Sequence, residues 1–365
     1  MTGQVRATGS AAAIPGSYVV VLKDSSVSSS AVGSTASSMA TRYGGKVQRS
    51  WGVALRGFEF TGSSLSARRL AADPSVAYVE QNQVFRVDDT QQNATFGLDR
   101  IDQRNLPVDG TYTFSTTASN VHAYVIDTGI RLTHADFGGR ATSGADFVDN
   151  DTDATDCNGH GTHVSGTIGG TTFGVAKQIQ LVAVRVLDCN GSGSTAGVIA
   201  GVNFVTQNAI HPAVANMSLG GGVSKALDDA VQNSIDSGVT YAIAAGNDGA
   251  NACNTSPARV TGALTVGATQ QDDTRASFSN IGRCVDIFAP GVNITSDFLD
   301  SDTATAVLSG TSMSTPHVAG GAALFLATHP TASPAEVATA LTSAATTGVV
   351  GDPGKHSPDR LLFVS

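Results

Sequence analysis

Long apolar runs, charged residues and aromatic residues are all scarce in this sequence. No stretch of about 18 consecutive apolar residues occurs, which excludes an ordinary transmembrane helix and a membrane partner. Residues 1–13 lack the charged start and the apolar middle of a secretory signal. Only 14% of the 365 residues are charged and 41% are hydrophobic, enough for one large core and a smaller appended domain.

Acidic and basic residues are unevenly distributed along the chain. Residues 1–88 contain 9 Lys or Arg and 5 Asp or Glu, whereas the remainder contains 12 and 25. The two parts therefore carry net charges of opposite sign, and we expect them to attract each other. The acidic excess argues against nucleic acid as a partner, because phosphate binding needs a basic surface.

Cysteine is also rare, with residues only at Cys157, Cys189, Cys253 and Cys284. None lies in a CxxC pair or near a second His with zinc-ligand spacing, so disulfides are favoured over a zinc site. Three pairings are possible, and the sequence alone does not choose among them; four buried free thiols are the alternative. Stable disulfides indicate a secreted protein, whose signal segment would lie outside this sequence and whose Met1 would be an added start residue.

The apolar pattern divides the chain into a polar start, a small domain and a large one. We expect residues 1–16 to be disordered. Residues 17–88 predict a small α+β domain with a helix-backed antiparallel sheet, with strands at 17–22, 57–60 and 76–80 and helices at 30–42 and 64–72. Residues 88–95 are polar and without an apolar period, which predicts an exposed connection open to cleavage.

Residues 89–365 show apolar strands separated by helices rich in small residues. This alternation predicts an α/β domain with a parallel sheet flanked by helices. We expect strands at 121–126, 181–187, 213–219, 239–245 and 263–266, and helices starting near residues 160, 194, 224 and 312. Ligands of such a sheet bind beyond the carboxyl ends of its strands.

Three side chains at strand ends and helix starts could form a catalytic group. Asp127 ends an apolar strand in Val-Ile-Asp-Thr-Gly, His160 opens a helix in His-Gly-Thr-His, and Ser312 starts another in Gly-Thr-Ser-Met-Ser-Thr-Pro. A serine nucleophile needs a base in hydrogen-bond reach, and that base needs a group that holds its tautomer. Taken singly, each residue also fits a structural role such as a helix cap.

Two further residues bear on this chemistry. Asn247 follows a strand in Ala-Ala-Gly-Asn, and its amide could stabilise the oxyanion of acyl transfer, with the backbone N–H of Ser312 as the second donor. His163 is the alternative base, although it also fits a core histidine bonded to backbone. We favour His160 over His163, and we expect His317 to have a structural partner.

These strings, with Ser-Leu-Gly-Gly at 218–221, resemble the subtilisin-like serine proteases over nearly the whole chain. The strings at 97–103, 156–160, 187–193 and 276–280 are most similar to the proteinase K branch and its aqualysin type. The resemblance implies a serine endopeptidase that acts through an acyl-enzyme, as a monomer without an organic cofactor. Residues 17–88 resemble the propeptide that inhibits these proteases and assists their folding, most clearly in Pro-Ser-Val-Ala-Tyr-Val-Glu at 74–80.

The resemblance also implies roles for individual residues. It pairs Cys157 with Cys189 and Cys253 with Cys284. It places two substrate-flanking strands at Gly191, Ser192, Gly193 and at Ser218, Leu219, Gly220, and a roomy P1 pocket at Ala244, Ala245 and Gly246. Such main-chain pairing tolerates many sequences, so we expect broad specificity for protein and peptide substrates, with apolar or aromatic P1 residues preferred. Ser314 departs from the alanine usual at its position.

Calcium is the expected metal, because hard oxygen ligands are abundant. Asp99, Asp102 and Gln103 are the first candidate site, where the family has a calcium position. Asp286, with the backbone carbonyls near Thr261 and Ala263, is the second. The acidic loop 149–153 is a third, for which a solvated turn is an equally good interpretation.

Two other functions remain open from sequence. The chain could be a binding or adhesion protein on a protease-like scaffold, with the catalytic residues present and unused. It could also be an esterase or a peptide ligase, since the same serine attacks esters.

Overall fold

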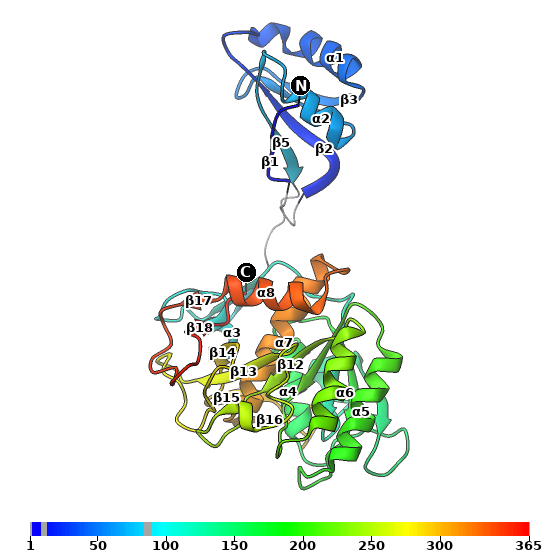
Figure 1. The fold of residues 1–365 in the computed structure, drawn as a ribbon, viewed down its shortest axis with the longest axis vertical. Coiled ribbons are helices and arrows are strands. Elements are labelled where there is room, and N and C mark those ends of the chain that lie inside the picture. The colour runs from blue at the N-terminus through cyan, green and yellow to red at the C-terminus, as the bar shows by residue number, and fades with distance from the viewer. Residues whose placement is uncertain (1, 9–12, 84–88, 365) are drawn as a thin grey trace. The chain divides into compact units, whose positions relative to one another are not determined.

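The structure is a computed structural model that describes residues 2–8, 13–83 and 89–364. The chain forms two compact units, residues 1–87 and 88–365, which are described separately (Figure 1). Residues 84–88, where the predicted boundary between the two domains falls, lie outside the described residues.

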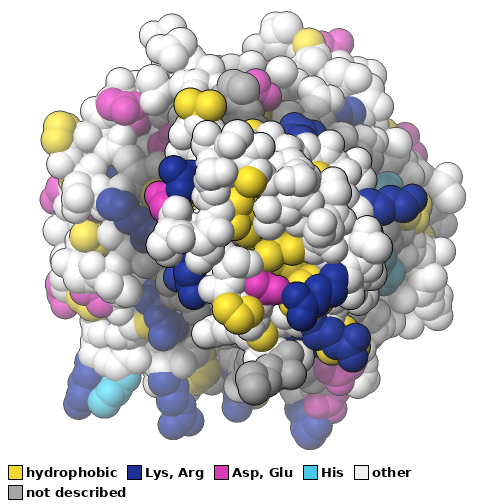
Figure 2. All heavy atoms as spheres, turned by 90° about the horizontal axis from the view of Figure 1, so that it is seen from above, with side chains coloured by type: hydrophobic (Ala, Val, Ile, Leu, Met, Phe, Trp, Pro, Cys, Tyr) yellow, Lys and Arg dark blue, Asp and Glu magenta, His cyan; other side chains and the backbone are white. Residues whose placement is uncertain are grey.

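The first unit is a five-stranded sheet with two helices. Its strand order is β1-β5-β2-β4-β3, and β2 pairs antiparallel with both β4 and β5. The strands are Val5–Arg6, Ala13–Leu22, Lys46–Trp51, Gly57–Thr61 and Val76–Gln83; η1 is Ser29–Ala31, α1 is Val32–Tyr43 and α2 is Ser64–Leu70. Alternate strand residues such as Tyr18, Phe58 and Phe60 are buried between sheet and helices. Figure 2 shows Lys and Arg side chains on one face of the molecule, with hydrophobic side chains among them.

Two sequence predictions differ from this unit. Residues 1–16 were expected to be disordered, but Val5–Arg6 form β1 and pair in parallel with Val79 and Glu80, and β2 begins at Ala13. β3 was not predicted, because Lys46–Trp51 is mostly exposed and shows no apolar alternation. Both strands lie at the edges of the sheet, where pairing with the neighbouring strand decides the structure.

The second unit is built on a nine-stranded sheet, ordered β17-β18-β14-β13-β12-β11-β8-β10-β9. All neighbours except β17 and β18 pair in parallel, which confirms the predicted parallel sheet. The strands are His122–Asp127 (β8), Ala141–Asp146 (β9), Gln180–Arg185 (β10), Ala213–Met217 (β11), Thr240–Ala244 (β12), Leu264–Thr269 (β13), Ile287–Pro290 (β14), Thr346–Thr347 (β17) and Arg360–Leu361 (β18).

Helices cover both faces of this sheet (Figure 1). Val125 and Ile126 are consecutive in β8 and point to opposite faces, into two separate hydrophobic clusters. One cluster includes residues of α4 (His160–Gly169), α7 (Thr311–Thr328) and α8 (Pro334–Ala344); the other includes residues of α5 (Thr195–Asn208) and α6 (Lys225–Asp236). Nearly all of α7 is buried, because α4 and β11 to β14 pack around it.

Smaller elements complete the second unit. These are two antiparallel ribbons, a helix and two short turns of 3-10 helix: β6 (Asp89–Gln92) with β7 (Thr111–Phe114), β15 (Ile294–Asp297) with β16 (Thr305–Leu308), α3 (Phe96–Ile101), η2 (Ala135–Phe137) and η3 (Ala252–Asn254). Part of the predicted exposed connection is therefore β6, whose pairing with β7 could not be read from its polar sequence. Among the described helices, none combines the length and the apolar character that a membrane span needs.

Candidate active site

Three elements of the second unit bring the predicted catalytic residues to the same end of the sheet. Asp127 is the last residue of β8, His160 is the first residue of α4, and Ser312 lies in the first turn of α7. The helix α4 packs against both β8 and α7. The end of a parallel strand and the starts of two helices therefore meet here, as expected for a ligand site of such a sheet.

Asp127 and His160 are joined by a short hydrogen bond. The Nδ1 atom of His160 lies 2.7 Å from Oδ1 of Asp127, and the same oxygen accepts a hydrogen bond from the backbone N–H of Thr128 at 2.8 Å. The Asp127 carboxylate is fully buried. Burial lowers the pKa of His160, but the Asp127 charge and hydrogen bond outweigh it, so the pKa is raised above its ordinary value. With Nδ1 occupied, Nε2 is the ring nitrogen left for proton transfer.

Ser312 is bonded to Ser218 rather than to His160. Its hydroxyl donates to the backbone carbonyl of Ser218 at 3.1 Å, and the Ser218 hydroxyl donates back to the carbonyl of Ser312 at 2.9 Å. None of the hydrogen bonds among the described residues joins Ser312 to His160, although the sequence predicted a base in hydrogen-bond reach. Such contacts are often long in sites without substrate and tighten when it binds.

Asn247 presents its amide nitrogen beside the start of α7. Its Oδ1 accepts hydrogen bonds from the backbone N–H and the hydroxyl of Thr311, at 2.8 and 2.9 Å. A Cβ atom on Gly310 would lie 3.5 Å from Asn247 Nδ2 and 3.7 Å from the Ser312 nitrogen, so both predicted oxyanion donors border the same space. Glycine leaves that space open to a ligand atom.

The two other histidines considered from sequence have structural partners. His163 is fully buried, and its Nε2 lies 3.1 and 3.2 Å from the carbonyl oxygens of Ile294 and Ala306. Burial lowers its pKa to about 4. His317 is also buried, with Nδ1 2.8 Å from the carbonyl oxygen of Met313 and a pKa lowered to about 4 by burial. Of the three histidines, His160 is the one that lies against Asp127.

Two of the three predicted substrate segments are hydrogen-bonded to the start of α7. Ser218, Leu219 and Gly220 directly follow β11, and Ala244, Ala245 and Gly246 end and follow the neighbouring strand β12. The backbone N–H of Gly246 donates to the Thr311 hydroxyl at 3.2 Å, which ties this strand end to α7. The third segment, Gly191, Ser192 and Gly193, is exposed in a turn where Asp188 accepts the Ser192 N–H at 3.0 Å.

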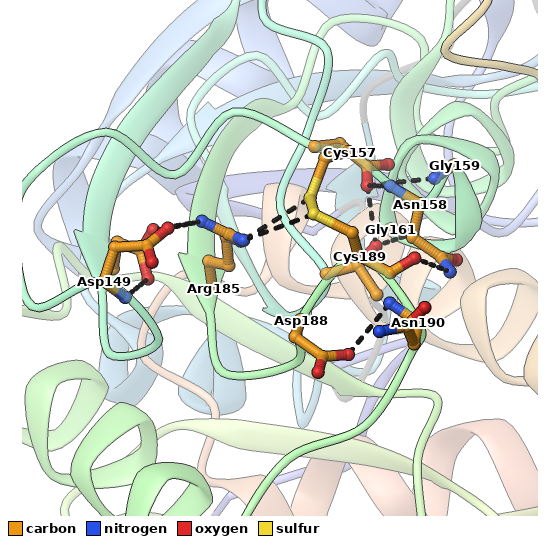
Figure 3. Close-up of a disulfide and its surroundings, with 12 residues drawn as sticks. Asp149, Cys157, Asn158, Gly159, Gly161, Arg185, Asp188, Cys189 and Asn190 are labelled. Carbon is orange, nitrogen blue, oxygen red and sulfur yellow. Dashed lines mark hydrogen bonds and ion pairs between the residues drawn. A yellow bond between two sulfur atoms is a disulfide. The ribbon is translucent and has the colours of Figure 1, made fainter.

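Two disulfides hold loops of the second unit. Cys157 pairs with Cys189 and Cys253 with Cys284, as the resemblance implied. The first joins the loop before His160 to the turn before Gly191 (Figure 3), and Asn158 Nδ2 reinforces it by donating to the Cys189 carbonyl at 2.9 Å. The disulfide therefore connects the segment that carries His160 to one of the predicted substrate segments.

At the first calcium candidate, the charges of Asp99 and Asp109 act on the Asp102 carboxyl. Both Asp99 oxygens accept backbone N–H groups, from Asp109 and Gly110. Asp102 Oδ2 accepts the Thr113 N–H at 2.6 Å, while its Oδ1 is buried without a partner. Burial, with the charges of Asp99 and Asp109, raises the pKa of Asp102 to about 6. An orphaned buried carboxylate oxygen among like charges is the chemistry that a bound cation would satisfy.

The other calcium candidates are less open to an ion. Asp286 is largely buried with a pKa raised to about 6, and its Oδ2 already accepts the Thr265 N–H at 2.9 Å. In the loop 149–153, Asp149 pairs with Arg185 at 2.6 Å, and Asp151 and Asp153 accept turn N–H groups. The described part of the chain contains no group of three or more His, Cys, Asp or Glu placed to hold a metal. A cation would need the Gln103 side-chain oxygen or backbone carbonyls as well.

Sequence reasoning gave no role to three residues that support the site. The backbone N–H of Thr128 donates to the Asp127 carboxylate, and the Asp156 carboxylate accepts the backbone N–H of Gly159. The Thr311 hydroxyl donates to the side-chain oxygen of Asn247. Thr128 and Thr311 are next to singled-out residues and Asp156 is four residues from one, all in the strings that carried the resemblance. The signal was their position in those strings, because their contacts span the fold.

Comparisons with known proteins identify the family of the chain. The model of the subtilase family matches residues 119–360. An extracellular serine proteinase of Thermus sp. (strain Rt41A) is 58% identical over 320 residues, which cover 88% of this chain and 78% of that protein. Alkaline serine exoprotease A of Vibrio alginolyticus is 53% identical over 331 residues, which cover 89% of this chain and 61% of that protein.

A solved structure extends the similarity to the fold. The crystal structure of a cold adapted subtilisin-like serine proteinase matches 75% of this chain and 99% of that chain, with a TM-score of 0.74 and 56% sequence identity. The predicted α/β fold of the large domain and the resemblance to subtilisin-like proteases are thereby confirmed. This chain belongs to the subtilase family and is a serine endopeptidase.

Proposed function

We propose that the chain is the precursor of a secreted endopeptidase in which Asp127, His160 and Ser312 form the catalytic triad. The observation that carries this proposal is the 2.7 Å hydrogen bond between His160 and Asp127 at the end of the sheet where Ser312 begins α7. Secretion is supported by the two disulfides and by the Thermus relative, which is named an extracellular proteinase.

Each residue has a defined step in the proposed reaction. Ser312 Oγ attacks the carbonyl carbon of the scissile bond while His160 Nε2 takes its proton, and the imidazolium then protonates the leaving amine. Asp127 stays ionised, holds the tautomer of His160 and stabilises the imidazolium. Asn247 Nδ2 and the Ser312 N–H donate to the oxyanion, and water then releases the acyl group by the same steps.

The substrate would bind as an extended strand. Ser218 to Gly220 and Gly191 to Gly193 would pair with its backbone on either side. Such pairing recognises the main chain of the substrate and therefore tolerates many substrate sequences. Ala244, Ala245 and Gly246 contribute no charge to the P1 pocket, so we propose a preference for apolar or aromatic P1 residues. A peptide library should be cut mainly at such residues; cuts concentrated after Arg or Lys would contradict the preference.

The first unit would act as a propeptide. Its basic excess complements the acidic second unit, and a partner that docks early would assist a parallel sheet whose contacts are non-local and form slowly. We propose that it blocks the cleft until the chain cuts itself within residues 87–95 and that the enzyme then acts as a monomer. N-terminal sequencing after incubation with calcium tests the cut, and expression without residues 1–88 should give poor folding.

Calcium would be held by Asp99, Asp102 and Gln103. When bound, it would supply positive charge that compensates the buried carboxylates and would stabilise the loop that follows α3. Chelation should therefore lower the thermal midpoint of the wild type and have a smaller effect on Asp102→Asn, whose buried oxygen no longer carries charge. An unchanged wild-type midpoint would contradict the calcium site.

The catalytic assignment is tested by casein hydrolysis. The wild type should cleave casein and Ser312→Ala should not, while thermal unfolding shows that both are folded. Equal cleavage by the two would refute the assignment, and two inactive folded proteins would favour a binding protein with an unused triad. Added amine nucleophiles would distinguish a ligase by capturing the acyl group.

A further inference from the structure

Asp156 is a buried carboxylate that takes no part in the proposed reaction, yet it lies four residues before His160. Its exposed fraction is 7%. Its Oδ1 accepts the Thr128 hydroxyl at 2.9 Å and the backbone N–H groups of Asn158 and Gly159 at 2.9 and 3.0 Å. Its Oδ2 accepts both the N–H and the hydroxyl of Thr162, at 2.9 and 2.6 Å. One side chain therefore satisfies five donors around the start of α4.

Thr128 connects this carboxylate to Asp127. It directly follows Asp127, whose Oδ1 accepts its backbone N–H at 2.8 Å. Its hydroxyl donates to Asp156 and accepts the N–H of Gly161, the residue after His160, at 2.9 Å. A Cβ atom on Gly161 would lie only 2.1 Å from the carbonyl oxygen of Gly129, so the two backbone segments are in direct contact here.

Thr162 makes a second connection between the same segments. Its hydroxyl donates to Asp156 and accepts the backbone N–H of Arg131 at 2.9 Å. The first turn of α4 is thus attached at both Thr128 and Arg131 to the chain that leaves β8. A carboxylate at a helix start is also favoured by the helix dipole.

We propose that Asp156 is a positioning residue, which fixes the imidazole of His160 relative to Asp127 through Thr128 and Thr162. The inference deepens the proposed function and rests on it, since it needs His160 as the base. The disulfide between Cys157, next in the chain, and Cys189 holds the same loop (Figure 3). There Asn158 and Gly159 are drawn beside it.

Asp156 also acts on His160 through its charge. Burial lowers the pKa of His160 and Asp127 raises it most strongly; Asp156 adds a smaller effect in the same direction as Asp127. This charge would shift the pKa of His160 whether Asp156 positions the imidazole or only stabilises the loop, so kcat is the readout that tests positioning. The two effects have separate readouts. The turnover rate reports on the position of the imidazole, and the acid limb of the pH profile reports on the charge of Asp156.

The experiment uses the full chain after self-processing. Asp156→Asn keeps the shape and removes the charge and one acceptor; we expect kcat to fall by about 10- to 100-fold with little change in KM. The acid limb of kcat/KM should move to lower pH. Thr128→Val, which breaks the connection from the other side, should also lower kcat, and Thr128→Ser should restore most of it because it retains the hydroxyl.

Asp273→Asn is the matched control, since Asp273 is 5% exposed and pairs with Arg100 outside the site. It should lower the thermal midpoint without lowering kcat or moving the acid limb. If Asp156→Asn behaves like this control, the inference is overturned. The proposed function would still stand, because it rests on the activity of the wild type. If Asp156→Asn does not fold, equal kcat in Thr128→Val and wild type would overturn it instead. A wild type as inactive as Ser312→Ala would refute the function and the inference together.

Discussion

Ser218 and Ser312 exchange two hydrogen bonds, each hydroxyl donating to the backbone carbonyl of the other residue, at 2.9 and 3.1 Å. The Ser218 hydroxyl also accepts the side-chain amide of Asn216 at 3.0 Å. The end of β11, where we propose that substrate pairs, is therefore bonded directly to the proposed nucleophile. Substrate that turns the Ser312 hydroxyl toward His160 would break one bond of this pair and leave the other intact.

Ser218→Ala should destabilise the protein and lower kcat. It leaves the buried Asn216 amide without its acceptor, and an unsatisfied buried group costs about 1–3 kcal/mol. Thermal unfolding is best measured in a Ser312→Ala background, which prevents self-digestion and retains the Ser312 carbonyl. Ser312→Ala lacks the hydroxyl of the reciprocal pair, so an unchanged midpoint would show that the Ser218 hydroxyl, with its bonds to Asn216 and the Ser312 carbonyl, contributes nothing to stability.

Asn247→Ala should lower kcat by about 100- to 1,000-fold and leave KM nearly unchanged, because the amide would donate only to the transition state. Thr311 would lose the acceptor of its N–H and hydroxyl, so stability must be measured alongside. Asn247→Asp provides the comparison, since it retains the acceptor oxygen and replaces the donor. If kcat stays at the wild-type level in both variants, the oxyanion assignment is wrong.

The surroundings of Asp297 predict that the stability of the folded protein depends on pH. It is fully buried in β15, and within the described residues neither oxygen accepts a hydrogen bond, although Nδ1 of His134 lies 3.5 Å from Oδ1. The Asp136 carboxyl lies beside it and can share a hydrogen bond only if a proton lies between them. Burial first, and then Asp136, raises the pKa of Asp297 to about 8. Below about pH 4 the Asp297 carboxyl is protonated in both the folded and the unfolded state. Between about pH 4 and pH 8 it ionises only in the unfolded state, so the free energy of unfolding falls as pH rises.

Asp297→Asn should remove this pH dependence. The amide cannot ionise and can donate to Asp136, so the variant should exceed the parent in unfolding free energy by about 1–3 kcal/mol at pH 8. The difference should shrink toward pH 4. Thermal unfolding at several pH values in the Ser312→Ala background measures it, and parallel curves for the two proteins would contradict the raised pKa.

Ser314→Ala should stabilise the protein. Ser314 is fully buried in α7 and its hydroxyl has no partner among the described residues. Removing an unpaired buried hydroxyl relieves a desolvation cost of about 1 kcal/mol and leaves only a small void. We expect a higher thermal midpoint and unchanged casein hydrolysis. A lower midpoint would mean that packing of this oxygen against Gly291 outweighs its lost hydration.

The sequence by itself determined the features that depend on local chemistry. The strings around Asp127, His160 and Ser312 indicated the family, and alternating apolar segments indicated the parallel sheet. The string Ser-Pro-Ala-Glu at 333–336 has the pattern of a capping box, and the structure contains that capping box at the start of α8. These features can be predicted from the sequence because residues close together in the chain produce them. β3, β6 and β9 are among the strands that were missed, since polar or partly exposed strands form through distant partners; β14 was missed as well, although all four of its residues are buried.

Only the tertiary structure decided between residues with the same local context. His160 and His163 share one helix and one motif, yet His160 lies against Asp127 while His163 lies between the carbonyls of Ile294 and Ala306. Asp156 and Asp297 likewise differ little from other aspartates in the sequence. Their roles depend on which buried donors and charges surround them. Packing sets those surroundings between segments 28 residues apart for Asp156 and Thr128, and 161 apart for Asp297 and Asp136.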